Sequence, residues 1–229
     1  MRKFLVMVAL VAAAGLAATA SAQEVREYGG PLEQNLVIPD GPTMDAGPVL
    51  VPGAPANAVQ TTITVPDSGA GPILDVNVTL GLHHSWYGDL NIYLTHGGTT
   101  VTLKDGLPDD SSNLGSAAGV AALYTLDDEA GGTWDAAAVA APLTSTFITA
   151  GAHRPNGTEA TAPANPFPSL LSAFDGMDKQ GDWVLSIDDT FLADTGFLSH
   201  FSLQITNVPE PATLGLLVVG AVSLIRRRR

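Results

Sequence analysis

The alternation of apolar and polar side chains across residues 75–103 is the feature of this sequence that most restricts its fold. It begins with an apolar residue at every second position, namely Leu74, Val76, Val78, Leu80 and Leu82. This period of two predicts a β-strand with one buried and one solvated face. After a corner at residues 84–89 the alternation resumes at 90–94, and Gly97 and Gly98 supply the positive φ angles of a hairpin turn before the return strand 99–103. The stretch therefore predicts a strand, a tight corner and a hairpin in an antiparallel sheet.

Further strand signals lie on both sides of this stretch. Residues 59–65 and 121–126 have the composition of short strands, and residues 183–187 and 201–205 alternate on either side of a turn, which we interpret as a second hairpin. No segment has a convincing helical period. We therefore predict an all-β fold, a jelly-roll-like β-sandwich of antiparallel sheets. Residues 105–172, rich in Gly, Ala, Ser and Pro, are expected to form a long irregular excursion.

The N-terminus has the organisation of a signal peptide. The basic start Met1-Arg2-Lys3 precedes the apolar residues 4–18, and Ala20-Ser21-Ala22 fits the small-residue rule for cleavage. We therefore expect residues 1–22 to form a signal helix that the Sec machinery and signal peptidase recognise. Residues 23–57 are rich in proline and glycine, which predicts an extended linker with at most one short strand at 36–38. The folded domain is expected at residues 58–207.

The charge of the chain restricts its partners. The 229 residues carry a formal net charge of −13 and contain no cysteine. This acidity excludes a nucleic-acid or anionic-lipid binder, because phosphate contacts require clustered Lys and Arg. An exported domain without disulfides depends on its core and on any ions that it binds. The same acidity permits a divalent cation, and Ca²⁺ is the candidate cofactor.

Acidic residues in turns are the candidate calcium ligands, since Ca²⁺ takes six to eight oxygen atoms. Asp127 and Asp128 come first, because the LDDEA segment at 126–130 concentrates charge without a basic partner. The other candidates are Asp89, Asp188, Asp189 and Asp194. The alternative is that Asp89 and Asp194 form Asx turns and that Asp188 and Asp189 are solvated charges at a strand end.

Three aromatic residues are candidate ligand contacts. Trp86 and Tyr87 at the corner, with Trp134 in a loop of glycines and alanines, would form an exposed platform for a sugar ring. Trp183 differs from them, because it alternates in phase with the apolar residues of its strand, which predicts a core position.

The sequence contains the residue types of a Ser-His-Asp catalytic site but not the motif that usually presents the serine. Ser85, many aspartates and the five histidines make a Ser-His-Asp set available in number; the histidines are His83, His84, His96, His153 and His200. The sequence has no Gly-x-Ser-x-Gly elbow, so we do not expect an enzyme. His83 and His84 would point to opposite faces of a strand and would not converge on one metal ion.

Several segments, in this order, resemble the P domain (P/Homo B domain), the β-sandwich beside the catalytic domain of subtilisin-like proprotein convertases. The segments are HSWYGDLNIYL at 84–94, GGTTVTL at 97–103, LDDEA at 126–130, HRPNG at 153–157, LSAFDG at 171–176, GDWVLSID at 181–188 and DTGFLSHFSLQI at 194–205. The sequence departs from the family at its hairpin turn, Thr95-His96-Gly97-Gly98, and in having Phe201 where the family has tryptophan. The linker at 23–57 leaves no room for a protease domain, so we expect the module without proteolysis.

The C-terminus resembles the PEP-CTERM sorting signal of Gram-negative bacteria that make exopolysaccharide. Val208-Pro209-Glu210-Pro211 is followed by an apolar run at 212–225 and then by Arg226, Arg227, Arg228 and Arg229. The resemblance implies that an exosortase, a membrane cysteine transpeptidase, recognises the tail at 208–229 and cleaves nearby.

The apolar run predicts a single transmembrane helix that spans the bilayer only marginally. At 1.5 Å per residue it reaches about 21 Å, short of a hydrocarbon core of about 30 Å. The arginines would hold that end in the cytoplasm, which leaves the domain outside the inner membrane. We expect transient anchoring, followed by release to the cell surface or the extracellular matrix.

Together these features predict a non-catalytic exported protein with a structural or adhesive β-sandwich, and exopolysaccharide is a candidate partner. Two alternatives remain open at the level of sequence. The first is a glycan-binding or protease-associated accessory module, and the second is an unrecognised hydrolase.

Overall fold

A computed structural model describes residues 23–41, 58–66, 70–106, 111–140, 146–155 and 168–209. The expected signal peptide, residues 42–57 of the expected linker and the tail from 210 onwards lie outside the described residues. In the part of the chain that is described, no helix is long and apolar enough to cross a membrane.

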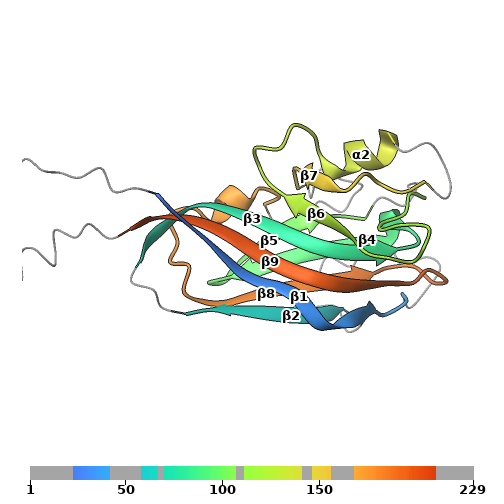
Figure 1. Cartoon of the computed structure of the whole chain (residues 1–229), viewed down its shortest axis with the longest axis horizontal. Coiled ribbons are helices and arrows are strands. Elements are labelled where there is room, and N and C mark those ends of the chain that lie inside the picture. Colours follow the sequence, from blue (N-terminus) through green and yellow to red (C-terminus); the bar gives the residue numbers. More distant parts are fainter. Residues whose placement is uncertain are drawn as a thin grey trace, which may run out of the picture.

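The described residues form two layered sheets with little helix (Figure 1). The elements in chain order are β1 (Glu24–Ile38), β2 (Val59–Val65), β3 (Ala70–His84), η1 (Tyr87–Asp89), β4 (Leu90–His96), β5 (Thr99–Lys104), β6 (Ala122–Leu126), α2 (Trp134–Ala140), β7 (Gly151–His153), η2 (Leu171–Phe174), β8 (Gly181–Asp189) and β9 (Gly196–Pro209). The five-stranded sheet has the order β1-β9-β3-β6-β7 and the four-stranded sheet the order β2-β8-β4-β5. Within these sheets only β6 and β7 pair in parallel. The predicted all-β sandwich of antiparallel sheets is confirmed.

The predicted strands are present, but two of the predicted pairings are wrong. The hairpin of β4 and β5 is confirmed, with Gly97 and Gly98 at φ 57° and 84° in its turn. β3, however, lies in the opposite sheet from β4, so the corner at 85–89 crosses between the layers. β8 and β9 do not form a hairpin either, since β8 pairs with β2 and β4 while β9 pairs with β1 and β3. Alternation identifies a half-buried strand but does not identify its neighbour.

β1 corrects the predicted linker. Fifteen of the residues assigned to it, Glu24–Ile38, form an edge strand that pairs with β9 from Glu24 opposite Asn207 to Ile38 opposite Gly196. A register shift between Pro31 and Leu36 accommodates the proline, which an edge strand tolerates because no partner needs its missing N–H. The Gly-Gly-Pro sequence concealed this strand, and the folded domain therefore begins at β1.

The core lies between the inner faces of the two sheets. β3 and β9 contribute the alternating residues Val76, Val78, Leu80, Leu82, Leu203 and Ile205, and the opposite sheet contributes Ile92, Leu94, Trp183, Leu185 and Ile187, all of which are buried. The predicted core position of Trp183 is confirmed by its 0% exposure. Its ring stacks on His96 with centroids 4.0 Å apart, and its Nε1–H donates to the Lys179 carbonyl oxygen over 3.0 Å.

Gly29 marks the place where the edges of the two sheets meet. Its φ of 83° disfavours a side chain, and a Cβ there would lie 2.6 Å from Cδ1 of Ile63 on β2 and collide with the Phe201 carbonyl oxygen. We expect Gly29→Ala to lower the free energy of unfolding by about 1–3 kcal/mol in urea denaturation. The control is Gly30→Ala, where φ is also positive but no atom lies within 4 Å of the added Cβ. Equal losses for both variants would contradict the close approach.

Candidate functional site

Two of the connections between the sheets, the corner from β3 to β4 and the turn from β8 to β9, meet at one end of the sandwich, and we call them the two crossovers. Ser85, in the corner after β3, donates its backbone N–H to the Thr195 carbonyl oxygen over 3.2 Å and its hydroxyl to Oδ1 of Asp194 over 2.8 Å. Thr195 returns a hydrogen bond from its N–H to Oγ of Ser85 over 3.1 Å. On the other crossover the backbone N–H of Thr190 donates to the Asp89 carbonyl oxygen over 3.0 Å. These bonds tie the corner to the turn that precedes β9.

Ionisable side chains are buried beneath this junction. His84 and Asp189 are fully buried, and His84 Nε2 lies 3.2 Å from Oδ2 of Asp189. The other ring nitrogen, Nδ1, lies 2.8 Å from the Trp86 carbonyl oxygen. Asp89 and Asp188, each 4% exposed, belong to the same cluster. Lys104 is buried with its Nζ 4.5 Å from the centre of the Tyr87 ring.

Burial and like charge alter the ionisation of these carboxyl groups. Burial, with the neighbouring Asp189 and Asp194, raises the pKa of Asp89 to about 7, although His84 and Lys104 act in the opposite direction. Burial and Asp189 raise the pKa of Asp188 to about 6. Asp89 and Asp188 therefore retain protons at pH values where a solvated aspartate is ionised.

A second acidic group lies around the end of β6. Both carboxylate oxygens of Asp128 accept backbone hydrogen bonds at the start of η2, from Leu171 over 3.0 Å and Ser172 over 2.8 Å. Asp127 Oδ1 accepts from the Glu129 N–H over 2.8 Å, which is an Asx turn. Burial, followed by the charges of Asp127 and other carboxylates, raises the pKa of Asp75 on the neighbouring strand.

The aspartates predicted as calcium ligands are therefore not brought into one site. Asp89, Asp188, Asp189 and Asp194 lie at the junction of the crossovers, whereas Asp127 and Asp128 belong to the second acidic group. Across the described residues, no three His, Asp or Glu side chains are arranged to hold a metal ion. The sequence indicates these aspartates as candidate ligands, but charge density along the chain does not show which turns meet in space, and calcium binding stays a prediction.

Three other histidines form hydrogen bonds within the fold. His96 has its two ring nitrogens 3.0 and 2.7 Å from the carbonyl oxygens of Asp182 and Asp178, and His153 Nε2 lies 2.9 Å from the Thr149 carbonyl oxygen. His200 Nε2 lies 3.0 Å from Oγ of Ser202, but Ser202 is only 3% exposed in the middle of β9. Ser85, the serine singled out from the sequence, bonds to Asp194 and Thr195.

The predicted aromatic platform is also wrong. Trp134 is 0% exposed, because it begins α2 and its ring is packed among Tyr87, Tyr124 and His153 at centroid distances of 5.5, 5.3 and 6.5 Å. Tyr87 is also fully buried, and its hydroxyl donates to Oδ1 of Asp135 over 2.9 Å. Of the three residues only Trp86 remains partly exposed. The small residues around Trp134 suggested a surface loop, whereas they allow the indole to be covered closely.

Trp134 therefore gives a stability test of its place in the core. We expect Trp134→Ala to lower the free energy of unfolding by about 3–5 kcal/mol, the usual loss for a large buried aromatic side chain. Trp86→Ala, at a half-buried position, should cause a clearly smaller loss in the same chemical denaturation experiment. Comparable unfolding free energies for Trp134→Ala and the unmodified chain would overturn the assignment.

The buried carboxyl groups predict the pH dependence of stability. Because the folded pKa of Asp89 exceeds the unfolded value, the folded state binds more protons between about pH 4 and pH 7, and stability falls as pH rises through this range. We expect the melting temperature to be several degrees higher at pH 5 than at pH 8. Asp89→Asn should flatten this dependence, and the exposed Asp182→Asn is the control. A melting temperature that rises from pH 5 to pH 8 would contradict the assignment.

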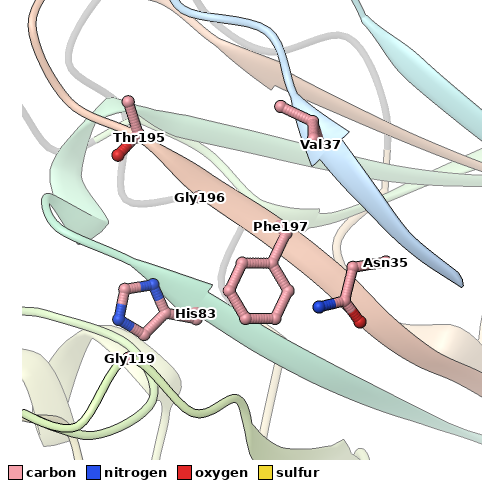
Figure 2. A pocket seen from close by; sticks show the side chains of 7 residues that line it. All are labelled: Asn35, Val37, His83, Gly119, Thr195, Gly196 and Phe197. Carbon is pink, nitrogen blue, oxygen red and sulfur yellow. The ribbon is translucent and has the colours of Figure 1, made fainter.

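A hollow on the outer face of the five-stranded sheet was not predicted from the sequence. It has a volume of about 400 Å³ and is lined by Asn35, Val37, His83, Gly119, Thr195, Gly196 and Phe197. Figure 2 shows the rings of His83 and Phe197 lying side by side, with Asn35 on the far side of Phe197. The ring centroids are 5.3 Å apart and the planes differ by 12°. An outward-facing aromatic residue of β9 was the available signal, but Asn35 and Val37 come from β1, of which the sequence indicated only a short strand at 36–38.

Comparison with known proteins identifies the tail. Residues 207–229 match the family model of the PEP-CTERM protein-sorting motif. This motif implies an exported protein that is anchored at the membrane before an exosortase processes it. No curated protein matches the chain.

Two solved structures are similar to the chain at low identity. One is a serine protease of Aeromonas sobria, with 15% identity, a TM-score of 0.34 and coverage of 84% of this chain. The other is the Aeromonas sobria serine protease in complex with its chaperone, with 15% identity, a TM-score of 0.34 and coverage of 88% of this chain. The chain spans 29% and 30% of the lengths of those chains.

Proposed function

We propose that this chain is a non-catalytic exported protein whose β-sandwich has a structural or adhesive role at the cell surface or in the extracellular polysaccharide matrix. The match of residues 207–229 to the PEP-CTERM sorting motif carries this proposal. Export through the Sec machinery, removal of residues 1–22 by signal peptidase and release of the tail by an exosortase would complete the route.

The limits of the folded domain fit this route. β1 begins at Glu24, two residues after the predicted cleavage site at Ala22, so removal of the leader would leave the edge strand intact. β9 ends at Pro209, which pairs with Ala70, and the side chain of Asn207 is fully buried and accepts a hydrogen bond from Lys179 Nζ over 3.1 Å. The sorting motif therefore starts where the sandwich ends.

Membership of the P domain family forms part of the same proposal. The segments that resemble the family fall on structural units of the sandwich: residues 84–94 cover the end of β3, the corner, η1 and the start of β4, and residues 97–103 cover the turn and β5. Residues 181–188 lie on β8 and residues 194–205 cover the second crossover and most of β9. The resemblance is thus concentrated on the two crossovers and the strands that flank them.

A non-catalytic role is supported by the way the reactive side chains are used. His84 is fully buried against Asp189, and His96 is engaged with two carbonyl oxygens. The Ser202 hydroxyl beside His200 is buried in a strand. We expect no turnover of ester or peptide libraries, and turnover that is abolished by Ser202→Ala or His200→Ala would favour the hydrolase alternative.

The sorting route is tested by the intact mass of the mature protein. In cells with a working exosortase we expect a species that begins near Gln23 and lacks residues 212–229. Cells from which the exosortase gene is deleted are the control, and they should retain the tail. A mature protein that keeps both Ala212 and Arg229 in cells with a working exosortase would contradict the proposal.

A further inference from the structure

We propose that the hollow lined by His83 and Phe197 binds one sugar ring of a neutral polysaccharide. The inference deepens the proposed adhesive role, on which it rests, by naming a ligand class and a site. This site differs from the aromatic platform predicted from the sequence, whose main residues are buried.

The two rings form the floor of the hollow. His83 on β3 and Phe197 on β9 are paired residues of adjacent strands, so the sheet itself holds their rings together. The rings are nearly parallel, with a 12° angle between their planes, and Figure 2 shows them side by side over the strands. The face of an aromatic ring is electron-rich, and it attracts the weakly positive C–H groups on the face of a pyranose ring.

The rim supplies groups that suit sugar hydroxyls. Asn35 and Thr195 are both exposed and lie at the edge of the hollow. An amide and a hydroxyl each donate and accept hydrogen bonds, as a sugar hydroxyl does. An apolar floor with a few polar groups around it is the usual composition of a small-molecule site, and about 400 Å³ falls within the usual range for one.

The charge of the site favours a neutral ligand. None of the described residues that line the hollow is Lys, Arg, Asp or Glu. Burial and the adjacent His84 lower the pKa of His83, so its ring is uncharged at neutral pH. The chain as a whole carries a formal net charge of −13, which disfavours an acidic polymer.

The form of the surface favours a sugar over a protein partner. Val37 at the rim is 70% exposed and Val120, next to Gly119, is 60% exposed, but scattered apolar residues of this kind are normal on a monomeric protein. The hollow is small and its rim is polar, whereas a protein docking surface needs a broad contact. A second copy of the chain is the alternative occupant of this surface. The experiment below distinguishes self-association from sugar binding.

The test is affinity gel electrophoresis of the purified full chain through gels that contain laminarin, dextran or galactomannan, with alginate as the acidic comparison. We expect at least one neutral polysaccharide to retard the chain more than alginate does. Phe197→Leu, which keeps an apolar side chain but removes the aromatic face, should weaken that binding by about tenfold. Asn35→Ala should weaken it about threefold to tenfold.

Asn77→Ala is the matched control, because Asn77 lies on the same outer face in the middle of β3, away from the lining of the hollow, and should leave binding unchanged. Melting temperatures establish that each variant folds.

A second measurement uses the unmodified chain. The NMR signals of the His83 ring should shift when an oligosaccharide of the polysaccharide that retards the chain is added. The proposal is overturned if no neutral polysaccharide retards the chain, if Phe197→Leu and Asn35→Ala bind as well as the unmodified chain, or if Phe197→Leu instead changes the oligomeric state in sedimentation velocity. None of these results depends on processing of the tail, so the site and the sorting route can fail separately.

Discussion

The hydrogen bonds between the corner after β3 and the turn before β9 are the constraint on which the rest of the sandwich depends. Both segments carry the chain from one sheet to the other, and they do so side by side at the same end of the molecule. Ser85 bonds to Thr195 while Thr190 bonds to Asp89, so neither crossover can shift without the other. The partners of β3, β4, β8 and β9 are fixed as a consequence. The crossovers also bury His84 and Asp189 against one another and place carboxyl groups where their charge is poorly solvated.

The sequence predicts the strands of this domain better than their arrangement. The period of two in β3, β4, β8 and β9 reflects which side chains are buried, and that property is local to each strand. The choice between a hairpin and a crossover depends on contacts between segments far apart in the chain, as between Ser85 and Asp194. For that reason the connection from β8 to β9 was interpreted as a hairpin, and the corner at 84–89 as a turn within one antiparallel sheet. Only the last residues of β1, at 36–38, were predicted, because the glycines and the proline of the strand weaken its alternation. Its structure depends on its pairing with β9.

The candidate sites illustrate the same limit. Trp134 stands in a sequence typical of a surface loop, yet it is the first residue of α2 and is buried against β6 and β7, because its small neighbours allow close packing. The aspartates that look alike along the sequence take different roles, since Asp128 caps η2 while Asp89 is buried under the crossovers. The hollow needs Asn35 and Phe197, which are brought together only by the pairing of the first and last strands. The sorting tail, by contrast, is a short linear motif that does not depend on the fold, and it was found directly.

The antiparallel pairing of β1 with β9 determines which features of the molecule lie at each end of the sandwich. Glu24 lies opposite Asn207, so the start of the folded chain and the point where the tail leaves it are at one end, as Figure 1 shows. The hollow is at the other end of the same pair of strands, where Val37 lies opposite Phe197. The 14 residues of β9 span about 45 Å at the usual rise of a strand. While the tail holds the protein at the membrane, the length of the sandwich would separate the hollow from the point where the tail leaves the fold.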